Sequence, residues 1–204
     1  MKQRTEEWHK ARNCMITASR FGDVVANCES KRYQLYMTEL IANLEGAPFL
    51  QDDDKPWFRH GKKLESVAMA RYEFEKFMMG IEEDVQQTGF FTHPTLPFVG
   101  CSPDGILGNR LIEIKSSISY ENFTKLSKNG LPTVHKPQVQ GELWVCGFEV
   151  LDFVLFFQDP DERINDEIKI IEVFEDKKYH KFLEEKCCDF WEKANKLKSK
   201  KDLI

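Results

Sequence analysis

Apolar residues in the first third of the chain recur three and four positions apart, which is the spacing of an α-helix with one buried face. The clearest case runs from Lys31 to Leu44 and contains Tyr33, Met37 and Leu40 in phase. A second helix can be capped by Thr17 or Ser19. The pattern predicts helices over residues 5–12, 17–25, 31–44 and 57–78, with an acidic loop at 51–55 that ends at Pro56.

The pattern changes after residue 84 to short apolar runs that are typical of strands. Val150–Phe157 is apolar almost throughout, so we expect a strand that is buried on both faces, with 169–174 as its hairpin partner. Further strands are predicted at 85–91, 98–102 and 111–116, and helices at 120–127, 137–146 and 177–198. This order favours an α/β fold with a central mixed sheet flanked by helices.

Length and composition indicate a globular protein of one domain, which we expect to span residues 1–204. The chain has 204 residues with 16 Phe and 4 Trp, enough for a full core. No apolar run approaches a membrane span, and the N-terminal residues lack the apolar stretch of a secretory signal. We therefore expect an intracellular protein, cytoplasmic or nuclear, with no membrane partner.

The cysteines do not form a metal-binding pattern. There are 6, none in a C-x-x-C pair, and Cys187 and Cys188 are adjacent. This argues against a zinc site and against a cysteine-ligated iron–sulfur cluster, so we expect reduced thiols.

A net charge of −5 is unusual for a protein that binds nucleic acid. Carboxylates that hold cations count as negative in this sum, and basic residues also cluster at 59–63 and 193–201. The second cluster is more simply explained as a solvated helix end.

One constellation in the middle of the chain indicates chemistry. Pro103-Asp104 and Glu113-Ile114-Lys115 are separated by eight residues, with the second group on an apolar strand. Residues two apart leave the same face of a strand, so Glu113 and Lys115 project together. A turn that returns the chain would bring Asp104 beside them. Two carboxylates suit a hard divalent cation, and the lysine can orient or deprotonate a water.

Either half alone has an ordinary explanation. Pro-Asp-Gly is a common turn, and Glu-x-Lys is a common exposed strand face. Their order and spacing together resemble the PD-(D/E)xK nuclease signature.

Four separated blocks extend this likeness, and the chain resembles the phage lambda-type exonucleases, also called YqaJ-type viral recombinase nucleases. The blocks are Trp8 to Arg12 with Ile16-Thr17-Ala18-Ser19, Gly61 to Glu65, Ser102 to Gly105 with Glu113 to Lys115, and Gln138-Val139-Gln140 with Trp144. They cover most of the chain in the family's order. The resemblance implies a restriction-endonuclease-like core.

The resemblance also implies a metal site. Asp104, Glu113, the backbone carbonyl of Ile114 and Glu65 would hold two Mg²⁺ ions, with Mn²⁺ as a substitute. Lys115 would position the attacking water. Without the resemblance, Glu65 would be taken as a surface charge paired with Lys62 or Lys63.

Other residues acquire roles in the same way. Arg12 and Ser19 would hold the 5′ phosphate end of the substrate strand. Gln140 is the expected active-site glutamine, with Gln138 as the second choice, because residues two apart on a helix do not share a face. A phosphate contact by Ser117 is the weakest of these assignments.

The implied activity is Mg²⁺-dependent 5′-to-3′ digestion of one strand of linear double-stranded DNA. It would release mononucleotides and leave a 3′ overhang for a single-strand annealing protein. The resemblance also implies a homotrimer around DNA. Three alternatives remain at this point: an endonuclease of the same superfamily, a non-catalytic DNA-binding relative, and a structural α/β domain with an accidental match.

Overall fold

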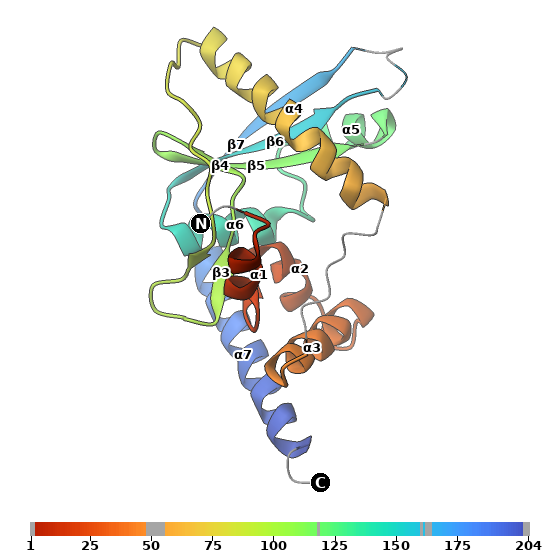
Figure 1. The fold of residues 1–204 in the computed structure, drawn as a ribbon, viewed down its shortest axis with the longest axis vertical. Helices are drawn as coiled ribbons and strands as arrows, with labels where there is room; N and C mark the ends of the chain where they lie inside the picture. Colours follow the sequence, from red (N-terminus) through yellow and green to blue (C-terminus); the bar gives the residue numbers. More distant parts are fainter. Residues whose placement is uncertain (1–2, 48–55, 118, 160, 162–164, 202–204) are drawn as a thin grey trace.

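The structure of the protein is a computed structural model that describes residues 3–47, 56–117, 119–159, 161 and 165–201 (Figure 1). The strands are β1 (Ile16–Thr17), β2 (Phe91–Thr92), β3 (Val99–Cys101), β4 (Gly105–Leu107), β5 (Arg110–Ser117), β6 (Val150–Phe157) and β7 (Glu167–Phe174). The helices are α1 (Glu6–Arg12), the 3₁₀ turn η1 (Ala18–Arg20), α2 (Phe21–Val24), α3 (Lys31–Leu44), α4 (Pro56–Met78), α5 (Tyr120–Ser127), α6 (Lys136–Cys146) and α7 (Lys177–Lys201). The predicted acidic loop at 51–55 lies outside the described residues.

The main sheet has the strand order β4-β5-β6-β7, with a parallel pair at its centre and antiparallel pairs at both sides. Every residue of β6 is buried, and β7 pairs antiparallel along its whole length. Both predictions for this hairpin are confirmed. The α/β class with mixed strand directions is confirmed as well.

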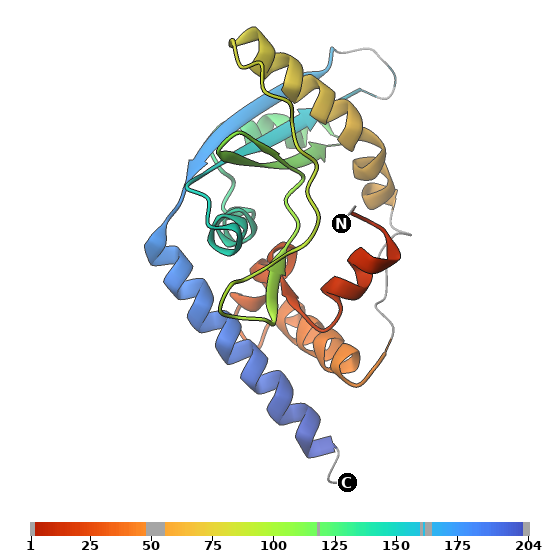
Figure 2. The same cartoon turned by 60° about the vertical axis from the view of Figure 1, so that its left-hand side comes forward.

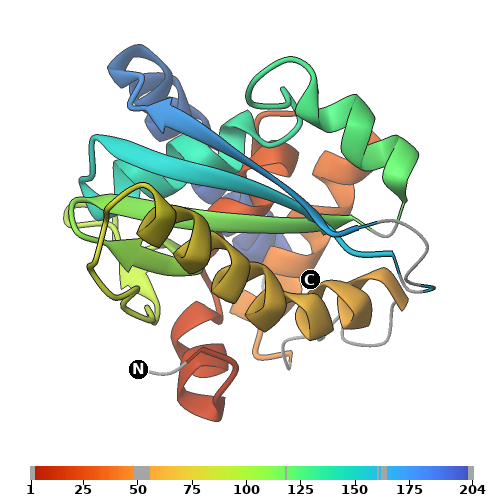
Figure 3. The same ribbon diagram turned by 90° about the horizontal axis from the view of Figure 1, so that it is seen from above.

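Helices cover both faces of this sheet, and the two-residue period of β6 divides its side chains between them. Val154 and Phe156 pack with Ala68 and Tyr72 of α4. Phe153, Leu155 and their neighbours pack with residues of α5 and α6, namely Phe123, Val139 and Leu143. Figure 3 shows α4 crossing one face of the sheet, with the other helices behind it.

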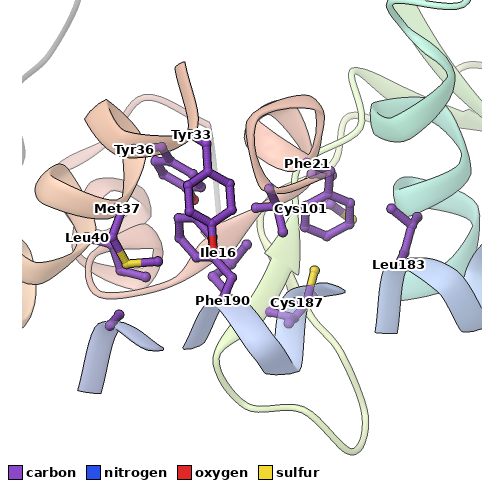
Figure 4. Close-up of a cluster of buried hydrophobic side chains, with 14 of the residues drawn as sticks. Ile16, Phe21, Tyr33, Tyr36, Met37, Leu40, Cys101, Leu183, Cys187 and Phe190 are labelled. Carbon is purple, nitrogen blue, oxygen red and sulfur yellow. The ribbon is translucent and has the colours of Figure 1, made fainter. Parts of the chain in front are cut away.

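A second core lies below the sheet and joins the N-terminal helices to α7 (Figure 1). Its rings pack closely: Tyr36 stacks on Phe190 with 5.3 Å between the ring centroids, and Tyr33 meets the same ring edge to face at 4.9 Å. Figure 4 shows these side chains together with Ile16 and Phe21. This core fixes the N-terminal segment against the rest of the molecule.

Helix α6 connects the two cores, and Figure 2 shows it almost along its axis beneath the sheet. Its contact with the N-terminal segment depends on Gly141. A Cβ atom built there would lie 2.3 Å from Cδ2 of Phe21, a distance that real side chains do not adopt. Glycine therefore allows α6 to lie directly on the Phe21 ring.

The structure corrects one expectation about the strands. The predicted strand at 85–91 is extended chain with a single bridge, Gln86 to Ile106, and only Phe91 and Thr92 form a strand at its end. The strands before and after Asp104 also belong to different sheets, since β1, β3 and β2 form a separate small sheet. The chain therefore passes from the small sheet to the main sheet at the Ser102–Asp104 turn.

All six cysteines are free thiols. The sulfur atoms of Cys101 and Cys146 lie 3.3 Å apart. Within the described part of the chain, no helix is both long enough and apolar enough to span a bilayer.

A buried ionic cluster fixes α4 to the sheet. Asp152 of β6 is fully buried, and its carboxylate accepts hydrogen bonds from the Tyr72 hydroxyl at 2.7 Å and Arg110 at 2.9 Å. Lys76, whose side chain is 8% exposed, lies 2.7 Å from the same carboxylate. Because the charges compensate one another, losing one partner leaves the others buried without compensation.

We expect Asp152→Ala to lower the free energy of unfolding by about 3–5 kcal/mol, because it leaves the Lys76 ammonium without its partner. Glu172→Ala is the matched control. It removes a half-exposed carboxylate that also binds Arg110, and should cost less than about 1 kcal/mol. Urea unfolding followed by circular dichroism measures both. Equal losses of unfolding free energy in the two variants would show that the buried Asp152 cluster stabilises the protein no more than an exposed ion pair does.

Candidate active site

The alternation of β5 places its two charged residues on one face. Ile112 and Ile114 pack in the cluster with α4. Glu113 and Lys115 therefore project to the opposite face, where the Glu113 carboxylate meets Gln138 of α6. The structure thus places Glu113 and Lys115 on one face of β5, as the sequence predicts.

Asp104 reaches the same strand from the turn after β3. Its backbone N–H donates to the Ile112 carbonyl at 2.9 Å, and its Oδ2 accepts from the Ile114 N–H at 2.7 Å. The side chain thus continues the β4 ladder by one step past Gly105. The Ile114 carbonyl points to the same edge as its N–H, so it lies beside the Asp104 carboxylate.

Glu113 is held through one of its two oxygens. Its Oε1 lies 2.5 Å from Nζ of Lys115 and 2.6 Å from Nε2 of Gln138. The residue is 3% exposed. Both donors use Oε1, so Oε2 is the oxygen that can bind a cation.

The electrostatics of the site depend on burial and crowded carboxylates. Burial, followed by the charges of Glu113 and Glu65, raises the pKa of Asp104 well above its ordinary value. Burial alone would lower the pKa of Lys115, but the nearby Glu113 and Asp104 raise it above its ordinary value. Lys115 is therefore an ammonium cation at neutral pH, suited to stabilising negative charge rather than to removing a proton.

Glu65 projects from α4 and contributes to the potential at Asp104. Its carboxylate forms an ion pair with Arg4 in the N-terminal segment. The same segment is fixed to the site by Gln3, whose amide donates to the Pro103 carbonyl at 2.7 Å. The structure thus brings Glu65 near the predicted metal ligands, with Arg4 as its partner.

The structure reverses the order of the two glutamines on α6. Gln138, not Gln140, contacts Glu113. The Gln140 amide donates to the Phe174 carbonyl at 2.8 Å, and its oxygen accepts from the Asp176 N–H at 2.8 Å. Both ends of Gln140 are used where β7 joins α7, so the expectation of a catalytic Gln140 is corrected.

Sequence reasoning missed Glu142, which lies one helical turn after Gln138. It is 1% exposed, and its Oε1 accepts from Nε2 of Gln138 at 2.9 Å. Burial and the charge of Glu113 raise its pKa well above the ordinary value. The four-residue spacing from Gln138 was the signal in the sequence that could have found it.

A polar cluster beside the carboxylates, here called the Arg12 pocket, is formed by Trp8, Arg12, Ser19 and Ser102. The Arg12 guanidinium stacks 4.2 Å above the Trp8 ring, and its two terminal nitrogens lie 3.3 Å from the Ser102 hydroxyl and 3.5 Å from that of Ser19. Burial lowers the pKa of Arg12. Arg12 forms no ion pair with the residues that the structure describes, and its buried Nε has no partner there. A guanidinium in this state is available to a phosphate.

Ser102 is a further residue that the sequence analysis did not assign to this pocket. Its hydroxyl also accepts from Nε1 of Trp8 at 2.9 Å. It stands two residues before Asp104, so the pocket and the carboxylates share one turn.

Ser117, the remaining candidate for a phosphate contact, does not join the Arg12 pocket in the structure. The Ser117 hydroxyl donates to the Ser119 carbonyl at 2.9 Å within a local turn, which accounts for the side chain without a phosphate. The side chains of the basic cluster at 59–63 lie outside the described residues. His135 lies near Lys115, and burial and this ammonium lower its pKa to about 4, so the ring is neutral.

The donor set fits a hard divalent cation. Asp104 and Glu113 offer carboxylate oxygens and Ile114 a backbone carbonyl, which are the ligand types of Mg²⁺. Burial and the charges of Glu113 and Glu65 raise the pKa of Asp104, and a bound cation would oppose these effects. Across the described ranges, however, no three His, Cys, Asp or Glu side chains form a ready-made metal cluster.

Comparisons with known proteins show the family to which the chain belongs. Residues 7–149 match the family model described as a YqaJ-like viral recombinase domain. The chain therefore belongs to this family. No curated protein sequence matches it.

Solved structures share the fold over nearly the whole chain. The alkaline exonuclease LHK-Exo from Laribacter hongkongensis is 29% identical, with a TM-score of 0.81 over 97% of this chain and 96% of its own. Its complex with dAMP is 30% identical, with a TM-score of 0.81 and coverages of 96% and 95%. A phage-related exonuclease from Haemophilus somnus, 14% identical with a TM-score of 0.68 over 91% and 96% of the chains, shares the fold.

We expect Asp104→Asn to stabilise the cation-free protein. A carboxyl with a raised pKa binds its proton more tightly when folded, so the stability that Asp104 contributes is lost as pH rises from about 4. In EDTA at pH 8 the variant should melt higher than the unaltered protein, by about 2–4 °C for each kcal/mol of repulsion removed. The difference in melting temperature between the variant and the unaltered protein should be smaller at pH 5. Asp189→Asn, on the exposed side of α7, serves as control, and an equal shift there would argue against a charged cluster at Asp104.

Proposed function

We propose that this protein is a Mg²⁺-dependent exonuclease that digests one strand of linear double-stranded DNA from its 5′ end. The observation that carries the proposal is the convergence of Asp104, Glu113 and Lys115 at the end of β4, beside the Arg12 pocket. The relatives described as exonucleases support the reaction class, and the complex of one with dAMP supports a mononucleotide product.

Asp104, Glu113 and the Ile114 carbonyl would hold one Mg²⁺, with Asp104 and Glu65 on a second. Bound there, the pair of ions supplies a polarised phosphoryl oxygen and a water of lowered pKa. Arg4 pairs with Oε2 of Glu65, and the second oxygen of that carboxylate could serve as the ligand.

Lys115 acts as a cation beside the reacting phosphate. Its ammonium is fixed by Glu113 and orients the attacking water while offsetting the negative charge that develops on the phosphate. Gln138 takes the place that the sequence analysis gave to Gln140, because its amide is the one that reaches Glu113.

The Arg12 pocket would bind the 5′ phosphate of the strand being degraded. The planar guanidinium can grip two phosphate oxygens, and the hydroxyls of Ser19 and Ser102 can donate to them. Since Ser102 and Asp104 share a turn, a phosphate in the pocket places the next bonds of the strand near the carboxylates.

The family also suggests how the enzyme would work on long DNA. A ring-shaped homotrimer around the duplex would keep it on one molecule over many cuts. The 3′ strand left behind would pass to a single-strand annealing protein. Analytical ultracentrifugation with and without duplex tests the trimer.

One digestion decides polarity, strand choice and metal need together. Linear duplex with one 5′ end blocked is incubated with and without Mg²⁺, beside a closed circular duplex. We expect loss of only the strand with the open 5′ end, only with Mg²⁺, and an intact circle. Cleavage of the circle would instead identify an endonuclease.

Lys115→Ala should reduce cleavage by at least about 10²–10³-fold, as removal of one charge-stabilising donor does elsewhere. Binding of linear duplex, measured by fluorescence anisotropy in Ca²⁺, should persist because the carboxylates and the pocket remain. Lys178→Ala, an exposed lysine at the start of α7, is the matched control. Retained turnover in the purified Lys115→Ala protein would make the assignment of this lysine wrong.

Arg12→Ala should slow digestion of 5′-phosphorylated ends by about tenfold or more, the value of a charge-assisted hydrogen bond to phosphate. Ends that carry a 5′ hydroxyl should be affected much less. Initial rates on the two substrates give the ratio, with Arg71→Ala on the exposed side of α4 as control. An equal loss on both ends would contradict a role in phosphate binding.

A further inference from the structure

The buried carboxyl of Glu142 is unexpected in an apolar helix contact. Its neighbours Val139, Leu143 and Val145 are almost fully buried. Burying a carboxyl costs free energy unless it is fully hydrogen-bonded, yet its Oε2 has no hydrogen-bond partner in the described part of the chain. A leucine at this position would pack more favourably, so packing does not explain Glu142.

Its one hydrogen bond leads directly to the reacting groups. Nε2 of Gln138 donates to Oε1 of Glu142 at 2.9 Å and to Oε1 of Glu113 at 2.6 Å. An amide nitrogen carries two hydrogens, so these two carboxylates use both of them.

This arrangement settles which way the Gln138 amide points. Glu113 and Glu142 both offer acceptor oxygens to the Gln138 amide, so its nitrogen must lie between them. If the amide rotated, its carbonyl oxygen would face a carboxylate. Without Glu142 the amide could rotate and present its oxygen to Glu113, which would repel it.

We propose that Glu142 is a positioning residue that acts through Gln138, locking its amide so that Oε1 of Glu113 is occupied and Oε2 is left for a cation. The inference rests on the proposed function, because it assigns Glu113 to a cation site. Lys115 binds the same Oε1, so two donors from different elements enforce one orientation of this carboxylate.

The test is a double-mutant cycle of Gln138→Ala, Glu142→Ala and the double variant, read in two ways. Calorimetry with Ca²⁺ reports cation affinity without turnover, and the half-saturating Mg²⁺ concentration reports the same site during cleavage. Each single variant should lose about 10–100-fold in Ca²⁺ affinity, as loss of a partner that orients a ligand typically does. The double variant should lose no more than Gln138→Ala alone, within about twofold.

Two further variants exclude a folding effect. Glu142→Gln keeps an oxygen that can accept from Gln138, and should recover most of the affinity lost in Glu142→Ala. Glu149→Ala, exposed just after α6, should change neither readout. Circular dichroism melts confirm that each variant is folded at the assay temperature.

The outcomes separate this inference from the proposed function. Unchanged Ca²⁺ affinity in Glu142→Ala, or losses that multiply in the double variant, would overturn the positioning role while leaving the nuclease intact. Ca²⁺ binding without any cleavage by the unaltered protein would overturn the nuclease and leave the positioning role standing. An unaltered protein that binds no divalent cation would overturn both.

Discussion

The site depends on the two-residue period of one strand, β5. That period sends Ile112 and Ile114 into the core under α4 and turns Glu113 and Lys115 toward α6. A shift of the β5–β6 register by one residue would exchange the two sets, burying a glutamate and a lysine among apolar side chains. Because β6 is buried on both faces, that exchange is strongly disfavoured. The packing of the sheet therefore fixes the orientation of the charged pair.

The sequence predicted the parts of the site that obey local rules. Glu113 and Lys115 share a face because any strand places residues two apart together. Asp104 lies beside them because a turn returns the chain. The β6–β7 hairpin followed from its apolar runs, and the long helices followed from their spacing.

The features that could not be predicted depend on how elements far apart in the sequence pack against one another. Helix α6 is buried on nearly every side, so no polar stripe marks the face that meets Glu113, and Gln138 could not be told from Gln140. The strand expected at 85–91 carries suitable residues but has only a single bridging partner. Strand β4 is three residues long, too short for any periodic signal. The pairing of Arg4 with Glu65 joins residues far apart in the chain.

The close approach of α6 to Phe21, which the bare backbone of Gly141 permits, has a consequence for the polar groups of that helix. Helix α6 also carries Gln138 and Glu142, whose side chains meet next to Glu113. A side chain at 141 would push α6 away from the Phe21 ring and carry the Gln138 amide away from Glu113. The smallest residue of the helix therefore sets the spacing on which the contact between α6 and β5 depends.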